Sequence, residues 1–318
     1  MVEDKGAGVK NKRTAFLFPG QGAQYIGMGR DFYDLYPEAR LVFDRATEIL
    51  GPEIVDAIFY GPEEKLQQTE FAQPAILTVS LAIYRVLASR GLKASAVAGL
   101  SLGEYAALVA AEALTLEDAL PLVQKRGIYM QEAVPFGKGN MAAVMGLDHG
   151  EVEQICQEAQ SEGVVAPANY NCPGQTVISG QKDAVKRAMQ LASTAGAKRI
   201  TELKVSVPFH CALLKPVEEK MAAELEKTEI KKALVPVVSN VTANFGSEPE
   251  EIKQNLIVQV SNPILWEQSI RRLIDSEINC FIGVGPGTSL TRLMKRIAPE
   301  MEAYAVEKAG ELDQLIAN

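Results

Sequence analysis

A serine flanked by glycines stands in Gly99-Leu100-Ser101-Leu102-Gly103, between a short apolar run (95–100) and a stretch of helical period (103–113). This G-x-S-x-G spacing is typical of a nucleophile elbow, in which glycines permit a tight turn from strand to helix and the serine oxygen projects from the sheet edge. The N–H of the next residue, Leu102, would then lie at a helix N-terminus, which stabilises developing negative charge. Since five-residue matches also arise by chance, a glycine-rich helix cap is the alternative.

A serine nucleophile needs a base, and the chain has two histidines. His149 stands at an expected helix start and is interpreted as an exposed residue near the helix cap. His210 follows Val207-Pro208-Phe209, where an inserted unit is expected to rejoin a larger domain. Domain junctions often hold pockets, so His210 is the candidate base, with a hydrogen-bonded core histidine as the alternative. Cys211 is expected to point away from it as a small buried residue.

Two further segments could complete such a site. The run FPGQGAQ (18–24) follows the first expected strand and would lie at the carboxyl edge of a sheet, where its backbone N–H groups could bind an oxyanion. Neither this run nor GVGPGT (283–288) has the spacing of a dinucleotide fingerprint or a P-loop. Arg126, 25 residues after Ser101, could bind a substrate carboxylate through two hydrogen bonds. A solvated arginine on a helix surface is the alternative.

Composition places the chain among globular proteins, because 47% of its 318 residues are apolar and 23% are charged. The net charge of −8 argues against general binding to nucleic acids or anionic membranes. The four cysteines form no CxxC pair, and two histidines cannot build a His-rich metal site, so we expect reduced thiols, no metal and a cytoplasmic location. No apolar run is expected to approach the ~18 residues of a membrane span. Residues 1–13 are expected to form a flexible tail rather than a signal peptide.

Short apolar runs alternate with stretches of helical period, which predicts an α/β fold with a parallel sheet covered by helices. The expected strands are 14–18, 95–100, 235–239, 280–284 and 303–306. The expected helices are 75–88, 103–113, 213–228, 252–259, 264–276 and one from about 288, with Arg126 on a further helix.

The middle of the chain has a different pattern. Strands are expected at 141–147, 164–170, 176–179 and 199–207, with a turn at Asn171-Cys172-Pro173-Gly174 and helices at 150–161 and 183–195. The order β-α-β-β-α-β is that of a ferredoxin-like unit. We therefore expect a large α/β domain (14–136 and 208–318) with a small ferredoxin-like domain (137–207) inserted.

The motifs FPGQGAQ, GLSLGEY, QKRG, VPFH, QVSNP (259–263) and GVGPG together resemble, in order and spacing, those of the malonyl-CoA:acyl-carrier-protein transacylases. The resemblance runs from about Thr14 to the C-terminus. This family has a hydrolase-like α/β domain and a ferredoxin-like small domain, in agreement with the pattern above. The resemblance implies transfer of a malonyl group from malonyl-CoA to the phosphopantetheine thiol of acyl carrier protein. The reaction would proceed by a ping-pong route through a malonyl-serine, without a cofactor, and would supply fatty acid synthesis.

The resemblance also implies site roles. Ser101 would be the nucleophile and His210 its acid–base partner. Gln259 would orient the histidine through its backbone carbonyl. The backbone N–H groups of Gln21 and Leu102 would form the oxyanion hole.

Further features of the family concern the acyl group. Arg126 would hold the malonyl carboxylate, and Phe209 resembles the malonyl-selective version of its motif. Leu100 stands where many members have histidine, which concerns the hydrogen bonding around the site and not the Ser–His pair.

Other functions stay open at this point. In the usual serine hydrolase the histidine lies near the end of the fold, whereas 108 residues follow His210 and only two clear strands precede Ser101. A non-catalytic module that binds carrier protein or acyl-CoA would not need a nucleophile, a base and an oxyanion loop together. An acyltransferase of a polyketide assembly line would share the chemistry and differ in its carrier.

The partners expected are malonyl-CoA, CoA and an acidic acyl carrier protein. We expect a monomer that binds neither nucleic acid nor membrane. Because the chain is acidic overall, carrier docking would need a local basic patch. The candidates are Lys182, Lys186, Arg187 and Lys198 in the insert, or Arg271 and Arg272.

Overall fold

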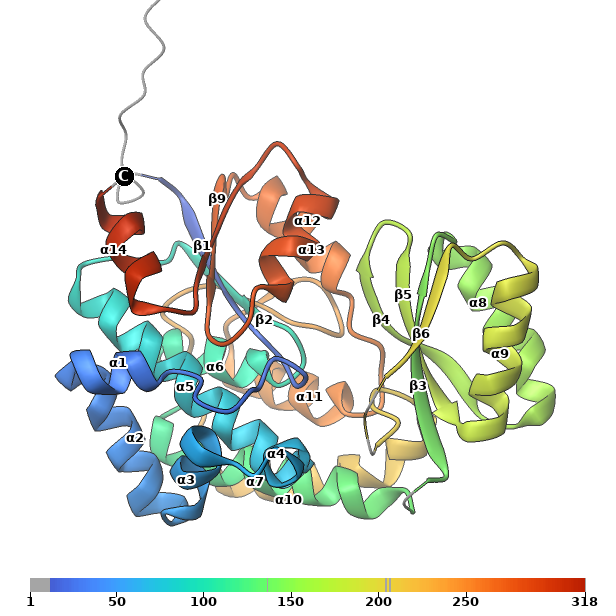
Figure 1. Ribbon diagram of the computed structural model, residues 1–318, viewed down its shortest axis with the longest axis horizontal. Helices are drawn as coiled ribbons and strands as arrows, with labels where there is room; N and C mark the ends of the chain where they lie inside the picture. Colours follow the sequence, from blue (N-terminus) through green and yellow to red (C-terminus); the bar gives the residue numbers. More distant parts are fainter. Residues whose placement is uncertain (1–11, 136, 204, 206, 318) are drawn as a thin grey trace, which may run out of the picture.

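A parallel sheet forms the centre of the protein. The computed structural model describes residues 12–135, 137–203, 205 and 207–317. The six strands of the sheet lie in the order β10-β9-β1-β2-β7-β8. Neighbouring strands are parallel, except that β8 runs antiparallel to β7. The strands are β1 (Thr14–Phe18), β2 (Ala96–Gly99), β7 (Val237–Val238), β8 (Phe245–Gly246), β9 (Cys280–Val284) and β10 (Glu302–Val306). The predicted α/β fold is confirmed (Figure 1).

Helices cover both faces of this sheet because its strands are apolar on both faces. In β1, Phe16 and Phe18 belong to one core. Ala15 and Leu17 belong to the other, as the alternation of side chains along a strand requires. The second core is closed by α12 (Trp266–Asp275) and α13 (Ser289–Ile297). The first is closed by α1 (Arg30–Leu35), α2 (Pro37–Leu50), α3 (Glu53–Tyr60), α4 (Glu63–Gln67), α5 (Thr69–Ser89), α6 (Gly103–Ala110), α7 (Leu116–Ala133), α10 (Lys215–Lys227), α11 (Pro249–Gln259) and α14 (Ala309–Ala317).

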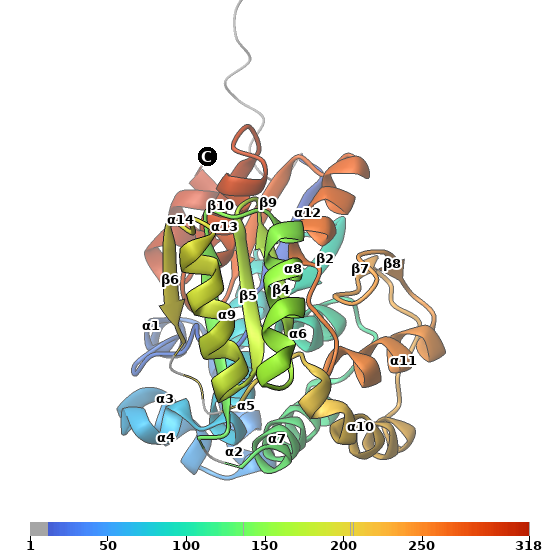
Figure 2. The ribbon, with the colours of Figure 1, turned by 90° about the vertical axis from the view of Figure 1, so that its right-hand side faces the viewer.

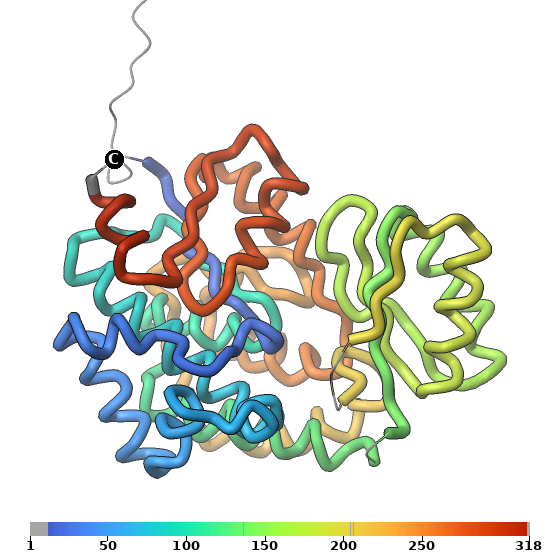
Figure 3. The backbone as a smooth tube through the Cα atoms, viewed as in Figure 1, coloured from blue at the N-terminus to red at the C-terminus, as the bar shows by residue number. Residues whose placement is uncertain are grey.

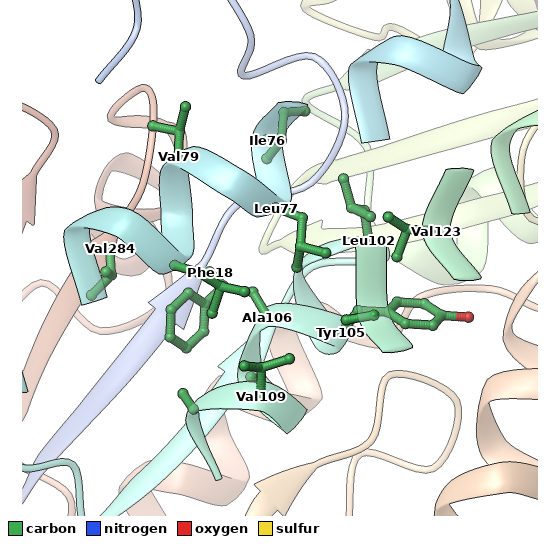
Figure 4. Packing of buried hydrophobic residues seen from close by; sticks show 14 of the residues in the cluster. Phe18, Ile76, Leu77, Val79, Leu102, Tyr105, Ala106, Val109, Val123 and Val284 are labelled. Atoms are coloured by element: carbon green, nitrogen blue, oxygen red, sulfur yellow. The ribbon is translucent and has the colours of Figure 1, made fainter. Parts of the chain in front are cut away.

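The longest helix, α5, runs through the first core. Its residues Ile76, Leu77 and Val79 gather with Phe18 of β1 and Tyr105 of α6 (Figure 4). Among the described residues, α5 is the one helix long and apolar enough to cross a membrane by length and composition. The expectation that no apolar run reaches that length is therefore wrong. Since 78% of the apolar window is buried inside the protein, the same pattern is accounted for by a core helix.

A second, antiparallel sheet lies beside the first, with strand order β4-β5-β3-β6. Its elements are β3 (Gly139–Met145), α8 (His149–Ala159), a 3-10 turn (Gln160–Glu162), β4 (Val165–Cys172), β5 (Gln175–Gln181), α9 (Lys182–Thr194) and β6 (Arg199–Glu202). Apart from the short 3-10 turn, this is the predicted β-α-β-β-α-β order. Figure 3 shows these elements as one continuous stretch of chain, and Figure 2 shows α8 and α9 covering the outer face of the sheet.

The two faces of β3 have different partners. Ala142 and Val144 pack against α8 and α9. Met141, Ala143 and Met145 lie on the opposite face, which looks into a cavity between the two sheets. The small sheet therefore forms a roof over the carboxyl edge of the large one.

The edge strand β4 connects the roof to the large sheet's layer. The N–H of Tyr170 donates to the carbonyl of Ile264, and the N–H of Ile264 donates to the carbonyl of Ala168. Ile264 follows α11 by five residues. The short segment after α11 thus links the end of that helix to the edge strand of the roof.

The chain leaves and rejoins the large domain between α7 and β3 and between β6 and the 3-10 turn Ala212–Leu214. We propose the boundaries expected from the sequence, with 14–136 and 208–318 in the large domain and 137–207 in the small one. Of the tail expected at 1–13, residues 1–11 lie outside the described part. Lys12 and Arg13 form ion pairs with Glu302 and Glu277.

Several elements differ from the expectation. The sequence did not predict α1–α4, β8 or α14. Strand β4 continues to Cys172, so the turn is confined to Pro173-Gly174. Strand β6 ends at Glu202, and residues 204 and 206 of the expected strand lie outside the described residues.

Candidate active site

Ser101 lies on the tight turn between β2 and α6, with a positive φ of 54°. A side chain at Gly99 would place its Cβ 1.9 Å from the backbone of Gly103, and a Cβ at Gly103 would lie 2.1 Å from the carbonyl oxygen of Phe18. These contacts explain why glycine stands at both positions of the motif. The strand, sharp turn and helix of the predicted elbow are present, and the glycine-cap alternative does not account for the strain at Ser101.

Asn240, in the turn two residues after β7, holds the elbow in place. Its Oδ1 accepts a hydrogen bond from the N–H of Ser101 at 2.6 Å, and its Nδ2 donates to the carbonyl of Gly99 at 2.7 Å. The side chain is fully buried. Sequence reasoning missed Asn240 because it stands 139 residues from Ser101 and belongs to no catalytic motif.

His210 contacts both the serine and α11. Its Nε2 lies 2.7 Å from Ser101 Oγ, and its Nδ1 lies 2.8 Å from the carbonyl oxygen of Gln259. Since a carbonyl only accepts, Nδ1 carries the proton, and Nε2 of the neutral ring accepts from the serine hydroxyl. Burial, followed by the positive charge of Arg126, lowers the pKa of His210 to about 3. The ring is therefore neutral near pH 7 and free to accept a proton.

Arg126 of α7 is buried beside the same serine, with 1% of its surface exposed, so the solvated-arginine alternative is wrong. Its terminal nitrogens donate to Ser101 Oγ at 3.2 Å, to Gln259 Oε1 at 3.0 Å and to Gln73 Oε1 at 2.8 Å. Burial lowers its pKa. A buried guanidinium at the nucleophile is suited to bind an anion.

The side chain of Gln259 is the centre of this network. Its Nε2 donates to the carbonyl of Ser101 at 3.1 Å and to Glu104 Oε2 at 2.8 Å. Its Oε1 accepts from Arg126. The sequence assigned a role only to the backbone carbonyl of Gln259. It gave none to Glu104 or Gln73, although Glu104 falls within the motif GLSLGEY.

The loop after β1 covers the elbow. A Cβ at Gly20 would lie 2.4 Å from the carbonyl oxygen of Leu100, so only glycine permits this approach. Leu102 stands at the N-cap position of α6. Within the described residues, the backbone N–H groups of Gln21 and Leu102 have no protein acceptor. Both are therefore available to a ligand oxygen, as an oxyanion hole requires.

These groups open into a cavity of about 740 Å³, a size usual for small-molecule sites. Its floor is formed by the elbow, His210 and Arg126, and its roof by the inner face of the small sheet. Phe209 also lines it. Arg292 and Arg296 of α13 add positive charge to its wall.

The remaining candidates lie elsewhere. His149 is not freely exposed as interpreted, because its Nδ1 contacts Thr176 Oγ1 at 2.6 Å and its Nε2 contacts Glu267 at 3.0 Å. It connects the small sheet to α12. Cys211 is buried, and its Sγ donates to the carbonyl of Pro208. In the described part of the chain, no group of three or more His, Cys, Asp or Glu side chains could hold a metal ion.

Comparison with known proteins decides the family. The model of the acyl transferase domain matches residues 15–313. Malonyl CoA-acyl carrier protein transacylase of Bacillus subtilis is 46% identical over 305 residues, which cover 96% of each chain. The chain belongs to the malonyl-CoA:acyl-carrier-protein transacylases. The resemblance found in the sequence is confirmed.

Solved structures of transacylases have the same fold. A malonyl-transacylase in complex with its type II PKS acyl-carrier protein is 40% identical, with a TM-score of 0.94, and the match covers 96% of this chain and all of that one. An acyl carrier protein S-malonyltransferase of Vibrio cholerae is 42% identical, with a TM-score of 0.93 and the same coverage. Since this chain is an acyltransferase, the hydrolase and the non-catalytic binding module are set aside as alternatives.

Proposed function

We propose that this transacylase transfers a malonyl group from malonyl-CoA to the phosphopantetheine thiol of an acyl carrier protein, through a malonyl-Ser101 intermediate. The observation that carries the proposal is the position of Ser101 Oγ, 2.7 Å from a neutral histidine and 3.2 Å from a buried arginine. The names of the relatives support the same substrates.

In the first half-reaction, His210 Nε2 takes the hydroxyl proton as Ser101 Oγ attacks the thioester carbonyl. The oxyanion is bound by the N–H groups of Gln21 and Leu102. A single such donor contributes ~10²–10³ in rate, and a positioned base ~10²–10⁴. When the C–S bond breaks, the proton on His210 passes to the CoA thiolate, and the malonyl group remains on Ser101.

In the second half-reaction, the carrier thiol gives its proton to His210 and attacks the serine ester. The C–O bond breaks, Ser101 recovers the proton from His210, and the thioester on the carrier is complete. Because CoA leaves before the carrier thiol reacts, the kinetics are ping-pong.

Arg126 binds the free carboxylate of the malonyl group in this scheme. Two parallel N–H donors match the two oxygens of a carboxylate. An acetyl group would leave the buried guanidinium without this partner, which disfavours it. Phe209, which also lines the cavity, is the second residue that we assign to selectivity for malonyl.

Carrier docking is proposed at the mouth of the cavity. Lys198 lines a second hollow that shares Arg296 with the main cavity. Three of the other candidates from the sequence are less suited. Arg187 and Arg271 form ion pairs with Glu158 and Glu267, and Arg272 stacks over a phenylalanine ring.

We propose that the acceptor is an acyl carrier protein of fatty acid synthesis. We also propose that the enzyme acts in the cytoplasm and as a monomer. A polyketide carrier is the second candidate, because the structural relative in complex with a type II PKS acyl-carrier protein matches this fold so closely. Comparing kcat/KM for the two kinds of carrier separates these candidates.

The decisive experiment is the intact mass of the protein after incubation with malonyl-CoA. We expect a gain of one malonyl group in the wild type, none in Ser101→Ala, and its loss when carrier protein is added. A stable wild type without an adduct, or an adduct that persists in Ser101→Ala, would overturn the proposed intermediate.

A further inference from the structure

A buried carboxylate, Glu104, lies beneath the nucleophile and takes no part in the steps above. It stands in the first turn of α6, three residues after Ser101, and 4% of its surface is exposed. Its Oε2 accepts hydrogen bonds from Gln259 Nε2 at 2.8 Å and from the N–H of Asn240 at 3.1 Å. Glu104 therefore joins α6 to both segments that support the site from later in the chain.

The carboxylate determines which way round the amide of Gln259 lies. The Nε2 group faces two acceptors, Glu104 Oε2 and the carbonyl of Ser101, while Oε1 faces the guanidinium. A flipped amide would place an oxygen against two acceptors and an NH₂ group against a donor. Glu104 and Arg126 thus specify one orientation from opposite ends.

The same arrangement places a negative group near a buried positive one. Only 1% of the surface of Arg126 is exposed, so water stabilises its charge little, and an uncompensated buried cation is costly. The charge of Glu104 favours the protonated form of Arg126. Burial, opposed by the hydrogen bonds from Gln259 and Asn240, raises the pKa of Glu104 to about 7.

We propose that Glu104 is a positioning residue for malonyl transfer. It holds Gln259 with Oε1 toward Arg126, and this fixes the guanidinium where it receives the acyl carboxylate. The inference rests on the proposed function. It deepens that function by assigning acyl selectivity to a chain of three side chains, Glu104, Gln259 and Arg126, of which only the last touches substrate.

The test compares kcat/KM for malonyl-CoA and acetyl-CoA. Without the carboxylate, Nε2 of Gln259 keeps the carbonyl of Ser101 as its acceptor but loses Glu104, so the amide is held less firmly and Arg126 is expected to shift. A misplacement of about 1 Å costs ~10²-fold, so Glu104→Ala is expected to lower malonyl transfer about 10- to 100-fold and acetyl transfer by less than about 3-fold. Glu104→Gln, which keeps the accepting oxygen, is expected to recover most of the malonyl rate. In an Arg126→Ala background, Glu104→Ala should have no further effect on malonyl.

Glu218→Ala is the matched control. Glu218 is also a buried carboxylate, and it accepts a hydrogen bond from Ser261, two residues after Gln259, but it does not contact the amide of Gln259. Its loss should affect both acyl groups alike. If Glu104→Ala fails to fold, as judged by Tm, Glu104→Asp replaces it, with the same unequal loss expected.

Equal losses for both acyl groups in the Glu104 variants would overturn the inference, as would additive effects in the Arg126→Ala background. Failure of Glu104→Gln to recover malonyl transfer would also contradict it. A wild type that transfers no malonyl group would instead reject the proposed function itself. The two failures are therefore distinguishable.

Discussion

His210 Nδ1 donates to the backbone carbonyl of Gln259 at 2.8 Å, the place where a serine hydrolase triad has a carboxylate. A carbonyl fixes the tautomer but carries no charge to stabilise the imidazolium. Burial and the nearby guanidinium of Arg126 lower the pKa of His210, and the backbone hydrogen bonds of the ring offset this lowering only in part. The ring of His210 therefore stays neutral, and able to accept the proton of Ser101, well below pH 6.5.

Formation of the Ser101 adduct should accordingly lack an acid limb near the ordinary histidine pKa of about 6.5. A lowered pKa means that protonation of His210 removes the base only as the pH falls toward 3. Single-turnover rates of adduct formation between pH 8 and pH 5 check this. A step near pH 7 that vanishes in Glu104→Gln would belong to Glu104. A limb at pH 6.5 that persists in that variant would contradict the prediction.

Arg126→Ala should reduce kcat/KM for malonyl-CoA by about 10²–10³, the usual cost of removing one partner of a buried charge pair. Acetyl-CoA has no carboxylate to lose, so its transfer should change much less. Steady-state kinetics with both substrates measure the difference. Equal losses would remove Arg126 from the acyl pocket.

Asn240→Ala should destabilise the protein and slow acylation together. The substitution leaves the N–H of Ser101 and the carbonyl of Gly99 without their partner, at ~1–3 kcal/mol for each buried group. The strained turn at Ser101 then loses its support. Thermal unfolding and the rate of adduct formation check the two effects. An unchanged rate in a folded variant would show that the turn holds its shape without Asn240.

Lys198→Glu should raise KM for the carrier protein about 3- to 10-fold and leave adduct formation from malonyl-CoA unchanged, because a rim charge acts mainly on encounter with the partner. Lys186→Glu, on the outward-facing helix α9, is the matched control and should alter neither. Identical KM values for both variants would place the carrier elsewhere on the surface.

Whether a site residue could be predicted from the sequence depends on how far along the chain its contacts lie. The elbow was predictable because its glycines are required by contacts within a few residues, such as that between Gly99 and Gly103. Asn240 and the side chain of Gln259 were not, because their partners lie 139 and 158 residues away. The motifs of the family named Arg126, but only packing shows that its guanidinium is buried.

The same reasoning applies to the fold. Most strands and several of the helices were found from their periodicity, whereas α1 to α4, β8 and α14 were missed. Helices α1 to α4 lack a side-chain hydrogen bond at their N-caps, and two of them have only five or six residues. The two short helices, α1 and α4, have too few residues to show an amphipathic repeat. Helix α2 does have one, with Ala39, Val42, Phe43 and Ala46 buried on one face, a proline in its first turn and a glycine after its end, so its sequence signals were present and were overlooked. The β-bridge contacts of the roof with Ile264 likewise leave no local trace in the sequence.

The backbone from Gln259 to Ile264 supports the base at one end and, at the other, hydrogen bonds to β4 at the edge of the roof. The length of this segment therefore sets the distance between His210 in the large domain and β4 in the small sheet. Substitutions between Gln259 and Ile264 leave the length of the segment unchanged. Insertion or deletion of a single residue would instead shift the floor of the cavity relative to its roof.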